Sequence, residues 1–146
     1  MSVTFGTTLE DVIERYHRGL DAFMKGDHES VKMLFSQQDD VTLGNPYGPF
    51  ARGFDDVVDT MSRAAAYYRD GQALGFDRIA TYGNEEFACI VEVERLRSKV
   101  GDHDDLAAFS LRVTTLFRAE EGGWKVAHRH ADPIDERRPA ESVLQP

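Results

Sequence analysis

The densest group of side chains that could do chemistry lies in the segment 124–132, which reads WKVAHRHAD. Alternate side chains of a β-strand share a face, so this strand would present on one face Trp124, Val126, His128, His130 and Asp132. Two imidazoles and a carboxylate on one face could shuttle protons or bind a divalent metal ion. They could equally be hydrogen-bonded within a polar sheet face or a subunit interface. An H-x-H pair alone does not define a metal centre, so we predict neither a metal nor a cofactor.

Charged residues on the preceding strands could extend this group. Glu92, Glu94 and Arg112 alternate with apolar residues such as Val91 and Val113. If the strand register allows, these three charged residues would lie on the same sheet face as His128, His130 and Asp132 and would form one polar patch with them. A patch facing the helices would line a polar cavity, whereas one facing away would form a solvated or dimer-forming surface. The alternation favours the second arrangement, although β-bulges can reverse the parity.

Other motifs indicate little chemistry. The run Asp102-His103-Asp104-Asp105 could hold a cation but is typical of a solvated loop. The chain has no G-x-S-x-G, G-x-G-x-x-G or P-loop motif, so nothing supports a serine hydrolase or a nucleotide-binding protein. Cys89 is the only cysteine, which excludes an internal disulfide and a cysteine-rich zinc site.

The elements that must position these residues follow from the hydrophobic periodicity. A capping box at Thr7–Glu10 and apolar residues at spacings of three and four predict a helix that ends near Gly26. A shorter helix after Asp27, a brief strand at 41–43 and a third helix after Gly53 follow. The period then changes to two, which predicts strands at 74–82, 87–96, 106–119 and 124–132. Helices followed by an antiparallel meander predict an α+β fold, with the helices packed on one face of a curved sheet and a tail at 134–146.

Length and composition limit the classes of protein. The 146 residues suit a single domain, and the net charge of −9 argues against a nucleic-acid partner. Charged residues interrupt the first twenty positions, and no apolar run approaches the ~20 residues that span a bilayer. We therefore expect a cytoplasmic protein without a membrane partner, which acts on small molecules or on other proteins.

The segments Asp39–Leu43 and Asn45–Gly48, with this order of elements, resemble the nuclear transport factor 2-like superfamily. The segments 112–118 and 123–130 resemble its SnoaL-like branch and the ketosteroid isomerase relatives. The resemblance spans roughly residues 7 to 133. It implies a cone-shaped domain with a pocket open at one end, which commonly dimerises through its sheet. Such relatives include isomerases, dehydratases, cyclases, hydrolases and non-catalytic assembly domains, so the resemblance does not identify a substrate.

Departures from the ketosteroid isomerase pattern bear on function. Asn45 stands where those enzymes carry a general-base aspartate, and Thr115 stands where they carry the aspartate that donates to the oxyanion. An amide and a hydroxyl cannot supply this pair, so ketosteroid isomerisation is not expected. Tyr16 lies on the first helix, as the catalytic tyrosine of that family does. The same alignment places Arg129 and Ala131 on the pocket side of the last strand, in conflict with a catalytic role for the two histidines.

We therefore expect an apolar pocket closed by aromatic side chains, namely Tyr16, Phe23, Tyr47, Phe50, Tyr67 and Phe117. Asn45, Thr115 and Arg129 would orient a small apolar or aromatic ligand, with His128, His130 and Asp132 as further candidates.

The sequence is compatible with two functions. The first is a cofactor-independent acid–base enzyme with a histidine or carboxylate base, in which Arg129 or Tyr16 stabilises negative charge. The second is a ligand-binding or assembly module without turnover. In either case we expect a homodimer that buries an uncovered sheet face carrying Leu116, Val126 and Trp124.

Overall fold

The structure is a computed structural model that describes residues 8–145. Helix α1 (Leu9–Phe23) begins at a capping box formed by Thr8 and Asp11. Its cap therefore lies one residue after the predicted one, and Thr7 falls outside the described residues. Helix α2 (Glu29–Lys32) is a single turn, and α3 (Phe54–Ala65) follows Gly53, whose positive φ of 89° favours glycine.

Six strands form one mixed sheet in the order β2-β1-β6-β5-β4-β3. Their bounds are β1 Thr42–Gly44, β2 Ala51–Arg52, β3 Tyr68–Gly83, β4 Phe87–Val100, β5 Ala107–Glu120 and β6 Gly123–Asp132. The α+β class is confirmed, but the sheet is not purely antiparallel, because β1 pairs with β6 in parallel. Strand β3 begins at Tyr68 rather than Leu74, and three register shifts against β4 bend the pair.

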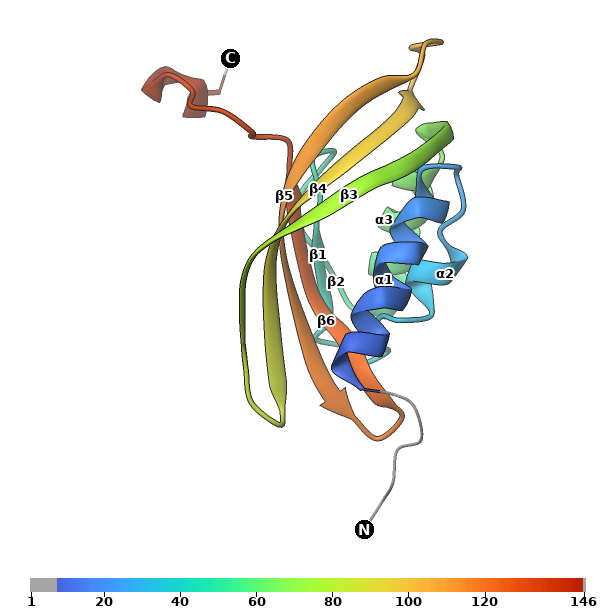
Figure 1. The fold of residues 1–146 in the computed structure, drawn as a ribbon, viewed down its shortest axis with the longest axis vertical. Coiled ribbons are helices and arrows are strands. Elements are labelled where there is room, and N and C mark those ends of the chain that lie inside the picture. The colour runs from blue at the N-terminus through green and yellow to red at the C-terminus, as the bar shows by residue number, and fades with distance from the viewer. Residues whose placement is uncertain (1–7, 146) are drawn as a thin grey trace.

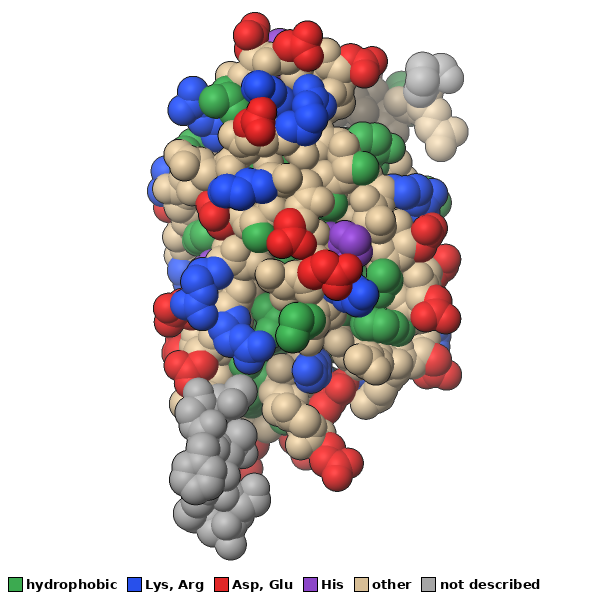
Figure 2. All heavy atoms as spheres, turned by 90° about the vertical axis from the view of Figure 1, so that its right-hand side faces the viewer, with side chains coloured by type: hydrophobic (Ala, Val, Ile, Leu, Met, Phe, Trp, Pro, Cys, Tyr) green, Lys and Arg blue, Asp and Glu red, His purple; other side chains and the backbone are tan. Residues whose placement is uncertain are grey.

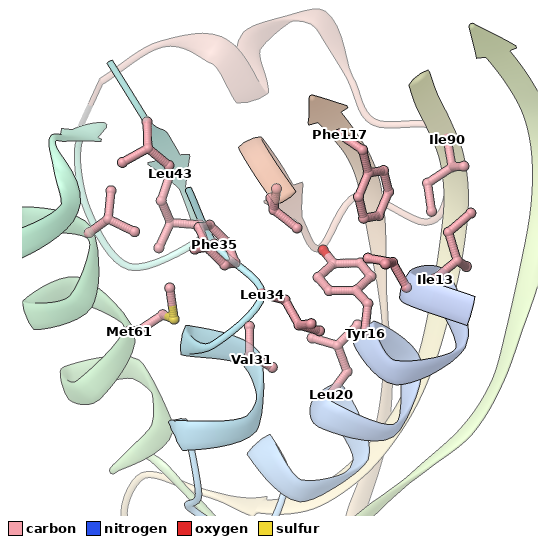
Figure 3. Close-up of a cluster of buried hydrophobic side chains, with 14 of the residues drawn as sticks. Ile13, Tyr16, Leu20, Val31, Leu34, Phe35, Leu43, Met61, Ile90 and Phe117 are labelled. Carbon is pink, nitrogen blue, oxygen red and sulfur yellow. The ribbon is translucent and has the colours of Figure 1, made fainter. Parts of the chain in front are cut away.

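The helices and the curved sheet enclose the core. Figure 1 shows α1, α2 and α3 on the concave side of the sheet, while the chain after β6 leaves on the other side and ends in a 3-10 helix at Ala140–Val143. Figure 3 shows the central contacts, in which Tyr16 packs edge-on against Phe117 with ring centroids 5.7 Å apart. Phe35, Ile90 and Val126 complete this buried layer and fix the distance between α1 and the sheet.

A β-bulge in β6 decides which of its side chains face the helices. Leu116 pairs with His128, but Phe117 pairs with Val126, so Ala127 is an extra residue and the parity reverses across it. Val126 is fully buried in the core, and beyond the bulge Arg129 and Ala131 are the buried residues. The predicted face that joined Trp124 and Val126 to the two histidines and Asp132 is therefore wrong.

The register of β4 and β5 also divides the predicted polar patch. Glu92 pairs with Val113 and Glu94 pairs with Leu111, so both glutamates share the helix-facing side with apolar residues. Arg112 lies on the opposite side and pairs with Asp132. Because of the bulge in β6, the uncovered face carries Leu116 but not Val126, which belongs to the core cluster, or Trp124, which packs against that cluster.

The helix side of the molecule has a mixed surface. Figure 2 shows acidic and basic side chains interspersed there, with apolar side chains in small separate patches. A nucleic-acid-binding face would instead gather Lys and Arg. Among the residues that the structure describes, no helix has the length and apolarity needed to cross a membrane.

Candidate functional site

A cavity lies between the helices and the sheet, and we refer to it as the inner cavity. Its walls are mainly apolar and are formed by Leu20, Phe23, Met24, Val31, Phe35, Leu43, Pro46, Met61, Ala64, Leu96, Leu111 and Ala131. Its polar groups are Asn45, Tyr47, Tyr68, Glu94 and Arg129. The volume open to the centre of a water molecule is about 50 Å³. Because this figure leaves out the shell of ~1.4 Å along the wall, the cavity has room for a single six-membered ring.

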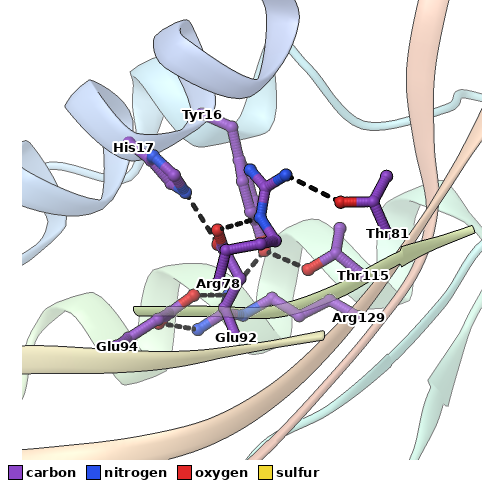
Figure 4. Close-up of polar contacts among 8 residues, drawn as sticks. All are labelled: Tyr16, His17, Arg78, Thr81, Glu92, Glu94, Thr115 and Arg129. Atoms are coloured by element: carbon purple, nitrogen blue, oxygen red, sulfur yellow. Dashed lines mark hydrogen bonds and ion pairs between the residues drawn. The ribbon is translucent and has the colours of Figure 1, made fainter. Parts of the chain in front are cut away.

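A buried ion pair forms the charged part of the inner cavity. Arg129 Nη1 and Nη2 donate to the two carboxylate oxygens of Glu94 over 2.7 and 2.8 Å, and the Glu94 side chain is fully buried. Arg129 Nη1 also donates to the hydroxyl of Tyr16, which forms a 3.0 Å hydrogen bond with Thr115 Oγ1. Figure 4 shows how these four side chains converge from α1, β4, β5 and β6.

Burial sets the protonation of this network. It raises the pKa of Tyr16 to about 12, against the opposing effect of Arg129, so this phenol stays neutral at physiological pH. Burial alone would lower the pKa of Arg129, but Glu94 and Tyr16 raise it above its ordinary value and keep the guanidinium charged. Burial, together with the hydrogen bond between the hydroxyls of Tyr68 and Tyr47, also raises the pKa of Tyr68. The cavity therefore offers one ion pair and the neutral phenol of Tyr68.

A second polar cluster lies beside the first, farther along α1. Glu92 accepts hydrogen bonds from Arg78 Nε and from His17 Nε2, each over 2.7 Å, and His17 stacks on Phe76. Burial raises the pKa of Glu92, but the bonds from His17 and Arg78 outweigh it, and the pKa lies below its ordinary value. This cluster ties α1 to β3 and β4 and does not line the inner cavity.

The predicted catalytic group of β6 lies on the other face of the sheet. His128 Nδ1 is hydrogen-bonded to Thr42 Oγ1 over 2.8 Å, and burial followed by His130 lowers the pKa of His128. Asp132 accepts two 2.9 Å bonds from Arg112, which lower its pKa. Within residues 8–145, no group of three His, Cys, Asp or Glu side chains could hold a metal ion. The geometry does not connect this group with the inner cavity.

The predicted ligand-binding residues separate into three sets. Asn45, Tyr47 and Arg129 line the inner cavity, as does Phe23. Thr115 and Phe117, like Tyr16, are fully buried behind its wall. Phe50 and Tyr67 line a neighbouring hollow on the surface.

The sequence interpretation missed Glu94 and Tyr68 as cavity residues. The signal for Glu94 was its position along β4. It lies an even number of residues from Ile90 and Leu96, which are core residues, and therefore shares their sheet face. Val91 and Val93 are apolar as well, so the alternation of β4 has two possible readings. Tyr68 precedes the strand predicted at 74–82, and β3 reaches back to it through the positive φ of Asp70 and a register shift between Arg69 and Gln72.

Comparison with known proteins assigns the family. The family model for the SnoaL-like domain matches residues 9–135, so the chain belongs to the SnoaL-like family, as the sequence resemblance implied. A candidate dehydratase of the nuclear transport factor 2-like family from Streptomyces avermitilis matches with 20% identity over 84% of this chain and 91% of that one, at a TM-score of 0.69. No curated protein matches the sequence.

Two further solved structures share the fold. A ketosteroid isomerase-like protein from Erwinia carotovora atroseptica is 17% identical over 88% of this chain and 95% of its own, at a TM-score of 0.70. A candidate calcium/calmodulin-dependent protein kinase type II association domain from Thiobacillus denitrificans is 16% identical over 88% of this chain and 97% of its own, at 0.72. At such identities the likeness shows the fold alone.

Removing one member of the buried ion pair should cost far more than removing both. Arg129→Met leaves the Glu94 carboxylate buried without its partner, and we expect the free energy of unfolding to fall by about 3–5 kcal/mol. The double variant Glu94→Leu with Arg129→Met removes both charges. Its free energy of unfolding should lie within about 1 kcal/mol of that of the wild type. Urea denaturation of the two variants measures this. A double variant as unstable as the single one would show that the fold itself requires the ion pair.

Proposed function

We propose that this domain binds a small, largely apolar or aromatic molecule in the inner cavity and that the Glu94–Arg129 pair binds the polar group of that molecule. The observation that carries the proposal is the placement of a fully buried ion pair on the wall of an otherwise apolar cavity. Packing alone does not require it, because a pair of apolar residues is often as stable at a buried site. A cavity with a few convergent polar groups is the usual form of a ligand site.

The ion pair retains hydrogen-bonding capacity for a ligand. Arg129 uses three hydrogen bonds, two to Glu94 and one to Tyr16, whereas a guanidinium has five N–H groups. The Glu94 oxygens each accept one bond from Arg129, and a carboxylate has about four acceptor positions. A hydroxyl group can therefore accept from Arg129 and donate to Glu94. This supports a phenol or an alcohol, or a carbonyl compound that only accepts, as the ligand class.

Toluene carries a methyl group in place of the hydroxyl of phenol, so the two ligands separate the polar from the apolar contribution to binding. We expect the wild type to bind phenol about tenfold more tightly than toluene, because only phenol satisfies the spare capacity of the ion pair. In the Glu94→Leu, Arg129→Met double variant the preference should reverse in favour of toluene. Isothermal titration calorimetry of both ligands with both proteins measures this. Equal discrimination by the two proteins would contradict the proposed role of the ion pair.

A second candidate is a cofactor-independent acid–base enzyme built on the same cavity. It is favoured by the Glu94 carboxylate on the cavity wall and by the neutral phenol of Tyr16, which hydrogen-bonds the guanidinium beside it. A carboxylate can remove a proton from a carbon next to a carbonyl, while Arg129 stabilises the negative charge that develops on oxygen. The fold relative named a candidate dehydratase is in keeping with such chemistry.

Exchange of the α-protons of cyclohexanone in deuterated water tests proton abstraction without knowledge of the substrate. The enzyme reading predicts exchange above the buffer rate, and Glu94→Gln should reduce it by about 10²–10⁴-fold. His130→Ala, on the opposite sheet face, serves as the control and should exchange like the wild type. Nuclear magnetic resonance follows the reaction. If the wild type exchanges the α-protons no faster than buffer does, the enzyme function is contradicted and the ligand-binding function is retained. If exchange is lost in His130→Ala but not in Glu94→Gln, the base lies on the uncovered sheet face.

The uncovered sheet face supports a homodimer as a further part of the proposal. Ile79 is 65% exposed there and lies beside Val91, Val93 and the Arg112–Asp132 ion pair. Burying such a face against its two-fold copy removes apolar area on both chains. A fold relative named a kinase association domain is in keeping with assembly.

Light scattering should give twice the monomer mass at micromolar concentration. Ile79→Glu places a charge in the proposed interface and should shift the protein to the monomer. The matched control is Met33→Glu, because Met33 is also 65% exposed but lies beside Arg15 and Arg18 on the helix side. A wild-type monomer, or equal dissociation by both variants, would contradict dimerisation through the sheet.

A further inference from the structure

A second hollow on the surface adjoins the inner cavity, and we refer to it as the outer hollow. It is lined by Asn45, Tyr47, Gly48, Pro49, Phe50, Ala51, Asp56, Thr60, Arg63, Ala64 and Tyr67. The volume open to the centre of a water molecule is about 250 Å³. Asn45, Tyr47 and Ala64 line both spaces. The two hollows are therefore neighbours, and Tyr47 contributes the large side chain that stands between them.

A small number of contacts hold Tyr47 in this position. Its hydroxyl forms a 2.6 Å hydrogen bond with the hydroxyl of Tyr68, and its ring meets Tyr67 edge-on at a centroid distance of 5.0 Å. The backbone turn beneath it is closed by Asn45 Oδ1, which accepts from the Tyr47 N–H over 3.0 Å. Tyr47 lies in the loop between β1 and β2 and is 45% exposed. Its side chain can therefore move aside without opening the core.

The two hollows offer different chemistry. The inner cavity is apolar apart from the Glu94–Arg129 ion pair, the phenols of Tyr47 and Tyr68, and the amide of Asn45. The outer hollow instead presents Thr60, Asp56 and Arg63 on one side of α3, together with the amide of Asn45. These groups both donate and accept hydrogen bonds. A ligand that filled both spaces would therefore need an apolar part and a polar part at opposite ends.

We propose that the inner cavity and the outer hollow are two subsites of one binding site. The position of Tyr47 determines how long a ligand this site can bind. The ligand class is a ring-bearing molecule with a flexible arm that ends in a hydrogen-bonding head group. The ring lies in the inner cavity with its oxygen at Glu94–Arg129, and the head group lies beside Thr60. This inference rests on the proposed function, because it assumes that the inner cavity binds a ligand.

Hydroxyalkylphenols with arms of increasing length, attached in the meta or para position, test the proposal against phenol. Each bound arm must displace Tyr47 and so break its hydrogen bond to Tyr68 and its contact with Tyr67. Tyr47→Ala should therefore raise the affinity for an arm that reaches the outer hollow by about tenfold relative to phenol. Tyr47→Phe loses only the hydrogen bond and should give a smaller gain, of about fivefold. Calorimetry measures each affinity directly.

A matched pair of ligands and a matched variant test the outer subsite. An arm that ends in a hydroxyl should bind about fivefold more tightly than the same arm ending in a methyl group. Thr60→Val keeps the shape of the side chain but removes its hydroxyl, and it should abolish that preference while leaving phenol binding unchanged. Melting temperatures of all variants control for folding.

The outcomes separate the failure of this inference from the failure of the proposed function. The two-subsite proposal is overturned if phenol binds but Tyr47→Ala does not raise the affinity for the hydroxyalkylphenols. It is also overturned if Thr60→Val still prefers an arm that ends in a hydroxyl over one that ends in a methyl group. In either case the proposal that the inner cavity binds a ligand is retained. If neither phenol nor any hydroxyalkylphenol binds, the proposed function fails and this inference fails with it. Both proposals are supported if Tyr47→Ala raises the affinity for the hydroxyalkylphenols and Thr60→Val abolishes the preference for the hydroxyl end group.

Discussion

A charged guanidinium can remain inside this fold only because two neighbours accept three hydrogen bonds from it. Glu94 on β4 meets Arg129 on β6 with two hydrogen bonds, and the Tyr16 hydroxyl on α1 accepts a third. An isolated buried charge would cost several kcal/mol, so the placement of these elements is coupled to the network. Thr115 on β5 extends it, which connects α1 to three successive strands of the sheet.

The bulge at Ala127 is the local feature that makes this arrangement possible. Without the extra residue, the side of β6 that carries Val126 would continue to His128 and His130, and Arg129 would face away from the helices. With it, β6 contributes Val126 to the core and Arg129 to the inner cavity. The histidines then lie on the uncovered face, beside residues that we assign to a homodimer interface. One inserted residue thus separates the candidate ligand site from the candidate assembly surface.

Periodicity was sufficient to predict the α+β class, the long first helix and the four long strands, because these depend on residues close in sequence. The parallel pairing of β1 with β6 was not predictable in this way, since it joins segments far apart in the chain. The placement of Arg129 on the cavity side followed only from the family resemblance, because a bulge leaves no mark in an alternating pattern. The pattern left Glu94 either on a cavity wall or on an exposed sheet face and favoured the second, because apolar residues occur at both parities of β4. The register between strands, and not the composition of each strand, decides which of these side chains face the inner cavity.

A crystal structure of the protein with bound phenol would show whether the ion pair in the inner cavity binds the polar group of a small ligand. We expect the phenol ring among Leu20, Phe35 and Leu111, with its oxygen within hydrogen-bond distance of both Arg129 and Glu94. Phenol bound only on the uncovered sheet face beside His130, with the inner cavity unoccupied, would contradict it.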